Sequence, residues 1–279
     1  MSARAVMDAV TAATGAAPSA TPAADAIAAA SAAQSVHTGF ALAVDKIEYA
    51  VMVPLVYLSI LALLVGIVLR IIVIMRAPPQ PYSLRLYPVA GNPGLAALRD
   101  TFGMPQVRRH KPLFWVSLMI YHVAFLLLIL GHLDILPQIN FVPPGSRDML
   151  GAGAVGAAVT LPLVFFIGRR FRSPVRELST PADYLLLLLL LFLFLFGDMM
   201  SWGNSWSEHG FIMTKQSFAN YFDGLVRFTF ADPRTVLHGS HYHFAVIHVL
   251  LAELFFFLLP FTKIMHTFFS VPINLLRRR

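Results

Sequence analysis

Cysteine is absent from the 279-residue sequence, and charged residues make up only 13% of it. Without cysteine the chain has no disulfide, no thiolate-bound iron–sulfur cluster, no zinc finger and no C-x-x-C-H site for a covalently attached haem. Ordinary soluble domains carry about 25% charged residues, so the composition argues against a cytosolic globular enzyme. Hydrophobic residues reach 57%, and the ten histidines are the plentiful candidates for holding a redox cofactor.

Five apolar stretches have the length of a membrane span: 49–70, 113–136, 149–168, 184–203 and 243–268. At 1.5 Å per residue each can cross a hydrocarbon layer ~30 Å thick. The sequence therefore predicts an all-α, polytopic membrane protein with five transmembrane helices in residues 47–279. Residues 1–46 are rich in alanine and lack the compact apolar core of a secretory signal, so we expect a flexible outer tail there.

The basic residues predict the orientation of these spans. Segments 70–112, 168–182 and 263–279 hold 15 of the 21 lysines and arginines, and the other connections hold six. Because basic loops stay in the cytoplasm, the N-terminus is expected outside and the C-terminus in the cytoplasm. The net charge of +7 then reflects topology, and we predict no nucleic-acid partner.

The outer connection 204–242 is long for a simple link. It carries an apolar stripe at helical spacing, which predicts an amphipathic helix along the outer membrane interface: Phe218, Tyr221, Phe222, Leu225 and Phe228. Docking of a partner is the alternative for this helix, and lying on the membrane is the interpretation we prefer.

Four histidines lie inside spans, His122 and His132 on the second and His248 and His266 on the fifth. On one continuous helix His248 and His266 would project from the same face ~27 Å apart, whereas His122 and His132 would be ~15 Å apart. Antiparallel spans would match His122 in depth with His266, and His132 with His248. The unequal spacings require tilted helices.

An imidazole from each side is a suitable pair of axial ligands for a haem iron. Such a six-coordinate iron leaves no open position, so it would carry electrons. The alternatives are hydrogen-bonded interior histidines or a His-dependent proton or metal transporter. Few carboxylates in the spans would neutralise a dication, chiefly Glu253 and the terminal Asp134 and Asp198.

Two segments carry a family resemblance: His-Val-Ala-Phe-Leu-Leu-Leu-Ile-Leu-Gly-His at 122–132, and Leu-Pro-Phe-Thr-Lys-Ile-Met-His at 259–266. They resemble the membrane cytochrome b subunit of respiratory nitrate reductase, the gamma-subunit family. Thr180-Pro-Ala-Asp-Tyr184 and the Pro-Phe-Thr-Lys-Ile-Met-His part of the second segment more closely resemble its relatives in sulfite-reductase-linked and heterodisulfide-reductase-like menaquinol-oxidising complexes. The likeness covers about residues 45–275. The chain departs from the nitrate reductase members in its Ala-rich tail, its longer outer loop and its short C-terminus.

The resemblance implies a multi-pass protein of the bacterial cytoplasmic (inner) membrane with two haem b. Such a protein would carry electrons between the quinone pool and a cytoplasmic iron–sulfur partner, and the terminal active site would lie on another subunit. The resemblance assigns His122 and His266 to the inner haem and His132 and His248 to the outer haem, as the depth argument does. Quinol, of which menaquinol is the kind expected, would be oxidised near the outer haem, beside Gly131.

Several residues near the outer side of the predicted membrane domain have two possible roles. Asp134 and Arg147, at the membrane edge, are candidates for the quinone site, or form an interfacial charge pair or a propionate contact. Loop histidines 209, 238, 241 and 243 are read as solvated, with a proton path or contact to an external redox subunit as the alternative. A non-redox membrane anchor is the remaining alternative for the whole chain.

Overall fold

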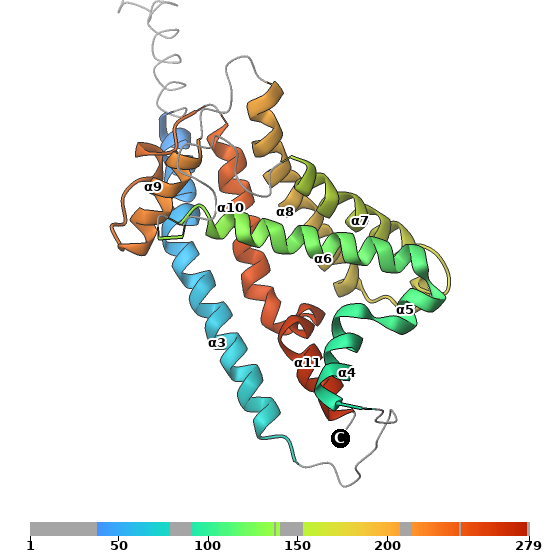
Figure 1. The fold of residues 1–279 in the computed structure, drawn as a ribbon. Helices are drawn as coiled ribbons and strands as arrows, with labels where there is room; N and C mark the ends of the chain where they lie inside the picture. Colours follow the sequence, from blue (N-terminus) through green and yellow to red (C-terminus); the bar gives the residue numbers. More distant parts are fainter. Residues whose placement is uncertain are drawn as a thin grey trace, which may run out of the picture. The chain divides into compact units, whose positions relative to one another are not determined.

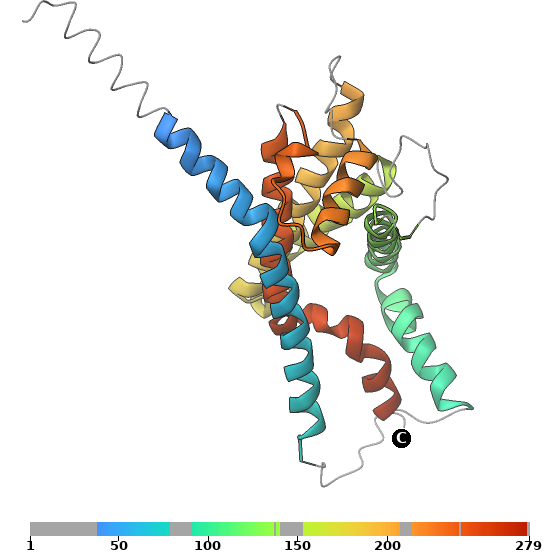
Figure 2. The same ribbon diagram turned by 90° about the vertical axis from the view of Figure 1, so that its left-hand side faces the viewer.

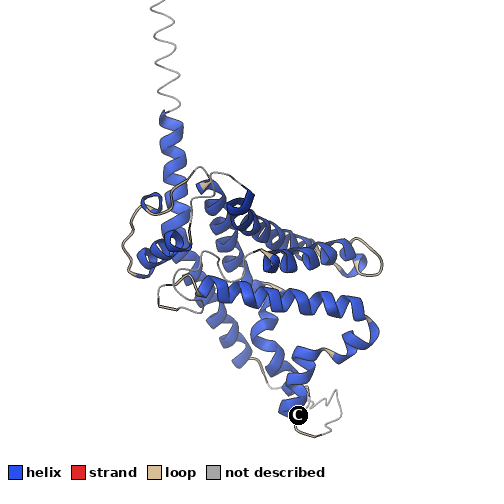
Figure 3. Cartoon of the chain, turned by 45° about the horizontal axis from the view of Figure 1, so that its top comes forward, coloured by secondary structure: helices blue, strands red, loops and turns tan. Residues whose placement is uncertain are grey.

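The structure is a computed structural model that describes residues 38–78, 91–136, 138–139, 153–206, 214–239 and 241–277, without the side chains of 203–206. All regular elements within these residues are helical (Figure 3), which confirms the all-α fold class. The chain divides into two units, Met1–Ile47 and Glu48–Arg279. Thr38 begins the helical part of the first unit, and the histidines of interest lie in the second.

Four helical segments are long and apolar enough to cross a membrane: Thr38–Met75, which contains α3 (Val56–Met75); Pro112–Leu133, which is α6; Pro181–Trp202, within α8 (Pro181–Trp206); and Tyr242–Phe261, which contains α10 (Tyr242–Leu258). The third expected span corresponds to α7 (Ala154–Arg170), whose 17 residues extend about 26 Å. Residues 140–152, where this span was expected to begin, lie outside the described residues, so the count of five spans stays a prediction.

The long helices pack in a series. Helix α6 packs on α7, α7 on α8, α8 on α10, and α10 on α3 (Figures 1 and 2). The series needs a close approach at Gly156 of α7, where a Cβ atom would overlap the carboxylate of Asp198 on α8. This favours helix packing, rather than room for a cofactor, as the role of that glycine. Large apolar side chains such as Leu58, Leu61 and Val123 remain exposed on the outside, as lipid contact requires.

The fifth expected span is interrupted, and here the sequence prediction is wrong. Helix α10 ends at Leu258, and two 3-10 turns follow, η5 (Leu259–Phe261) and η6 (Lys263–Met265). Pro260 has no backbone N–H to continue the helix, which accounts for the break. A new helix, α11 (His266–Leu276), then begins at the last histidine of interest.

The connection after α8 contains the predicted amphipathic helix, α9 (Lys215–Val226). Its apolar face does not lie free along a membrane surface: Tyr221 and Leu225 are buried in one cluster with the π-helical turn η1 (Val51–Leu55) and with Tyr242 of α10. The remaining short elements are η4 (Pro233–Thr235) and, on the chain before α6 and α8, α4 (Pro93–Leu98), η2 (Arg99–Gly103), α5 (Pro105–His110) and η3 (Arg176–Leu178).

Candidate functional site

The four histidines of the spans meet as two facing pairs. The first pair, His122 and His266, has ring centres 6.2 Å apart and ring planes at 75°. The second pair, His132 and His248, has the same 6.2 Å separation with planes at 18°. In each pair one imidazole comes from α6, and the other comes from α10 or from the first residue of α11. These are the two juxtapositions expected from the sequence, although His248 and His266 do not share a helix.

Every one of the four imidazoles has its Nδ1 atom against a backbone carbonyl. On α6 the distances are 2.7 Å from His122 to Leu118 and 2.7 Å from His132 to Leu128, both one turn back. The partner rings do the same: His248 Nδ1 lies 3.0 Å from the Leu193 oxygen, and His266 Nδ1 lies 2.9 Å from the Lys263 oxygen.

These contacts determine the tautomer of all four rings. A carbonyl oxygen only accepts hydrogen bonds, so each Nδ1 carries the proton and donates it. The Nε2 atom of each neutral ring then keeps an unshared electron pair. A second-ring hydrogen bond of this kind is what holds metal-binding histidines in orientation. Both pairs are therefore prepared to offer Nε2 to a metal.

The ring spacing agrees with that use. Two imidazole–metal bonds of ~2.0–2.1 Å on opposite sides of one ion would place the ring centres about 6.3 Å apart, against the 6.2 Å found in both pairs. His122, His132 and His266 are also exposed in the chain alone. A polar group in a membrane span needs a partner there, and a large apolar ligand around a metal would cover these rings.

Gly197 of α8 makes room for the second pair. A Cβ atom at this position would lie 3.1 Å from His248 Cε1 and 3.5 Å from its Nδ1. The same stretch of α8 supplies the Leu193 carbonyl that accepts from His248. Helix α8 thus both admits and orients this imidazole, although it contributes no histidine to either pair.

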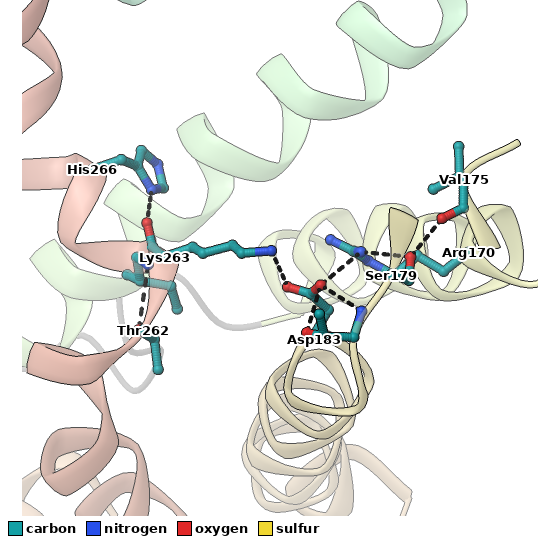
Figure 4. A network of polar contacts seen from close by, with 9 residues as sticks. Arg170, Val175, Ser179, Asp183, Thr262, Lys263 and His266 are labelled. Carbon is teal, nitrogen blue, oxygen red and sulfur yellow. Dashed lines mark hydrogen bonds and ion pairs between the residues drawn. The ribbon is translucent and has the colours of Figure 1, made fainter. Parts of the chain in front are cut away.

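A buried carboxylate fixes the turn that carries His266 (Figure 4). Asp183, at the start of α8, is 5% exposed and accepts from the Thr180 backbone N–H and hydroxyl, each at 3.0 Å. It also binds the Lys263 Nζ atom at 2.7 Å and lies 3.6 Å from Arg170 Nη1. Because the Lys263 carbonyl accepts from His266, the carboxylate ties α7, α8 and the first pair together.

Two of the three residues expected at the quinone site, Gly131 and Asp134, are neighbours of His132 in the sequence. Gly131 is buried next to His132. Asp134 is 2% exposed and pairs with Lys215 Nζ of α9 at 2.5 Å. Arg147, the other candidate, lies outside the described residues. The partner of Asp134 is thus a lysine 81 residues away, which the sequence analysis did not identify.

A second polar cluster was missed by the sequence analysis. Glu48 is 5% exposed and bonds both Arg234 and His243. Arg234 also lies over the Tyr242 ring, 5.3 Å from its centre. An open cavity of about 300 Å³ is bordered by Arg234, Tyr242, His243 and His238. His243 is therefore paired with a carboxylate rather than simply solvated; the available signal was an acidic residue at the start of an apolar span.

Other candidates have structural partners. Asp198 accepts from the Thr160 hydroxyl at 2.9 Å across the α7–α8 contact. His209 lies outside the described residues. Within the described part of the chain, three or more His, Asp or Glu side chains do not come together as a metal site.

Comparison with known proteins agrees with this geometry. The family model described as nitrate reductase gamma subunit matches residues 101–279, which include all four paired histidines. The chain belongs to the nitrate reductase gamma-subunit family. A search of curated proteins gives no match.

Membership of the gamma-subunit family settles the general role. The family consists of haem-binding membrane cytochromes b that act as electron-transfer subunits of a multi-subunit oxidoreductase. The chain is accordingly a membrane protein that works with redox partner subunits. Its two histidine pairs lie within the matched residues and have the ring spacing described above.

Proposed function

We propose that the chain binds two haem b, one between His122 and His266 and one between His132 and His248, and carries electrons between quinol and a partner redox subunit. The observation that carries this proposal is the repeated geometry of the two pairs. Both have ring centres 6.2 Å apart, and all four Nδ1 atoms face backbone carbonyls. Two accidental contacts between histidines would not share both properties.

A haem held by two imidazoles supplies a one-electron carrier with no open coordination position. The chain's own contribution is to hold the ligands in one tautomer, to surround them with apolar side chains and to set two centres in series. Aromatic side chains line the approach to the first pair: Tyr121 lies 5.5 Å from His122 and 6.0 Å from Phe125, centre to centre.

Quinol oxidation is proposed at the second pair, beside Gly131 and Asp134, with Arg147 as a further contact. A quinol hydroxyl must lose its proton as it gives up an electron, and the Asp134 carboxylate is placed to accept that proton. Lys215 Nζ, 2.5 Å from Asp134 Oδ2, compensates the charge of the carboxylate in its buried position. The same lysine can donate to a quinone oxygen once Asp134 is protonated.

The topology completes the proposal. We infer five spans in residues 47–279, with α7 as the third, in the inner membrane of a bacterium. The N-terminal tail 1–46 lies outside and the C-terminus lies in the cytoplasm. Electrons then move from menaquinol near the outer face towards an iron–sulfur subunit on the inner face. The likeness of 180–184 and 259–266 to the sulfite-reductase-linked and heterodisulfide-reductase-like members supports that choice of quinol and partner.

Absorption spectra of the purified chain, oxidised and dithionite-reduced, test the proposal. Two low-spin b-type haems per chain are expected. A colourless protein from cells supplied with ample haem would refute it. If the colourless chain then moves protons or metal ions in liposomes, it is a transporter; if it moves nothing and assembles its complex with all four histidines replaced, it is an anchor.

A further inference from the structure

Glu253 is a buried carboxylate that nothing in its surroundings compensates. It lies in the middle of α10, is 2% exposed, and neither of its carboxyl oxygens has a hydrogen-bond partner. The other buried carboxylates of the described residues each have a bonded partner: Glu48, Asp134, Asp183 and Asp198. An ionisable side chain inside a membrane protein, costly to keep there, marks a functional site by default.

No cation reaches this carboxylate within the described part of the chain. The titratable groups on the elements packed against α10 are Tyr57 and Arg70 of α3, Asp183, Tyr184 and Asp198 of α8, and Lys215, Tyr221 and Asp223 of α9, of which Lys215 pairs with Asp134 and Asp223 with Arg227. Arg70 donates to the Pro260 carbonyl at 2.9 Å, and the two aspartates of α8 are bonded as described above. Among these groups, the Tyr221 hydroxyl is the one whose pKa is affected by the charge of Glu253.

Tyr221 is already engaged elsewhere and does not compensate the carboxylate. Burial raises the pKa of the Tyr221 hydroxyl, and the charges of Tyr242 and Glu253 raise it further. Tyr221 donates to the Met52 carbonyl at 2.6 Å and is buried among the apolar side chains of η1 and α10. The Tyr221 hydroxyl is therefore already engaged and does not donate to Glu253. Because Glu253 is 2% exposed, its carboxylate faces protein rather than lipid.

The second histidine pair is close enough to act on Glu253 electrostatically. Glu253 follows His248 by five residues on one helix, which is ~7.5 Å along the axis and about 140° around it. The carboxylate thus does not enter the pair. A unit charge roughly 12 Å away, at an effective dielectric constant of about 20, changes the proton affinity of a carboxylate about tenfold.

We propose that Glu253 is a redox-linked proton-binding site. Its carboxylate binds one proton from the adjoining aqueous phase when the centre at His132 and His248 gains one electron, and it releases that proton when the electron moves on. Charge is balanced in both directions: one electron and one proton enter, and one electron and one proton leave. The inference rests on the proposed function, because it needs a redox centre at the second pair.

The test uses the full chain, loaded with haem, in lipid nanodiscs. Infrared difference spectra between the oxidised and dithionite-reduced protein should show the C=O stretch of a protonated carboxylic acid appearing on reduction and shifting in D₂O. Glu253→Gln should remove this band. The exposed Glu177→Gln is the matched control and should keep it, since the Glu177 side chain is 49% exposed.

Redox titrations over a series of pH values provide the second readout. The midpoint potential of the second-pair haem should fall with rising pH by a total of about 59 mV, which is the tenfold change converted for one electron. Glu253→Gln should flatten this dependence while both haem spectra stay intact. No carboxylic band in the unsubstituted protein, or an unchanged band and pH dependence in Glu253→Gln, would overturn the inference.

These outcomes are separable from failure of the proposed function. A chain without haem refutes the proposed function itself. A chain with two haems and potentials independent of pH refutes only the role of Glu253. If Glu253→Gln does not fold, Glu253→Asp takes its place: it should shift the band rather than remove it, and an unshifted band would overturn the inference.

Discussion

Replacing Gly197 with alanine tests whether α8 sets the position of a haem ligand. The added Cβ would lie 3.1 Å from His248 Cε1, about 0.5 Å inside the best carbon–carbon separation of 3.5–4.0 Å. If the imidazole moved away to relieve this close contact, its 3.0 Å hydrogen bond to the Leu193 carbonyl would lengthen towards the limit of a hydrogen bond. Groups of a functional site must be held within about 0.5 Å of their working positions, so a shift of this size is enough to disturb the ligand.

The magnitude follows from two opposing effects. Overpacking of this size costs about 1–3 kcal/mol, and exchanging glycine for alanine within a helix returns about 1 kcal/mol. Global stability should therefore change by no more than about 2 kcal/mol. The main effect should be on the position of the His248 ligand. Haem affinity at the second pair should therefore fall about 5- to 150-fold, while the first pair keeps its haem.

Haem content and the low-spin spectrum of each centre, measured beside the thermal unfolding midpoint, check this expectation. Gly168→Ala is the matched control, since a Cβ at Gly168 of α7 would meet no atom within 4 Å. It should leave both centres unchanged. Loss of haem from the first pair in Gly197→Ala, or two unaffected centres, would refute the assigned role of α8.

Three further predictions concern the pairs and their supports. His266→Ala should remove the first-pair haem, and His132→Ala the second-pair haem; absorption spectra showing the same haem lost from both variants would contradict the pairing. Asp183→Asn should lower stability by about 1–3 kcal/mol and weaken the first centre in particular, as seen by thermal melts followed at the haem band. Lys215→Met removes the ion pair of the buried Asp134 carboxylate and should cost about 3–5 kcal/mol; assays with a quinol analogue should lose activity, and the further change Asp134→Asn should restore stability.

Periodicity and composition predicted much of the fold. The second, third and fourth apolar stretches lie close to α6, α7 and α8, whereas the first and fifth differ more from the helices at their ends. The histidine positions indicated which imidazoles would meet. The reasoning about His248 and His266 was nevertheless wrong in one step, since it assumed an unbroken helix. The chain leaves the helix at Leu258, two residues before Pro260, and restarts at His266. That break removes the mismatch of ~27 and ~15 Å that the continuous helices implied.

Long-range polar contacts could not be predicted in the same way. Glu48 and His243 are 195 residues apart, and Asp134 and Lys215 are 81 apart. No period of a helix relates such positions; their contact depends on how α9 and the turn after it fold back on η1 and α10. The stripe on α9 was recognised, but an apolar face indicates only that something covers it, not whether lipid or protein does.

The two pairs differ in what holds their ligands, and this difference determines how each responds to perturbation. His122 and His132 donate to carbonyls four residues back on α6, and His266 donates to a carbonyl three residues back in its own turn. These supports form whenever the local backbone forms. His248 instead donates to a carbonyl 55 residues away on α8. The second pair therefore depends on the packing of α8 against α10, so changes between those helices should alter its potential before they alter that of the first pair.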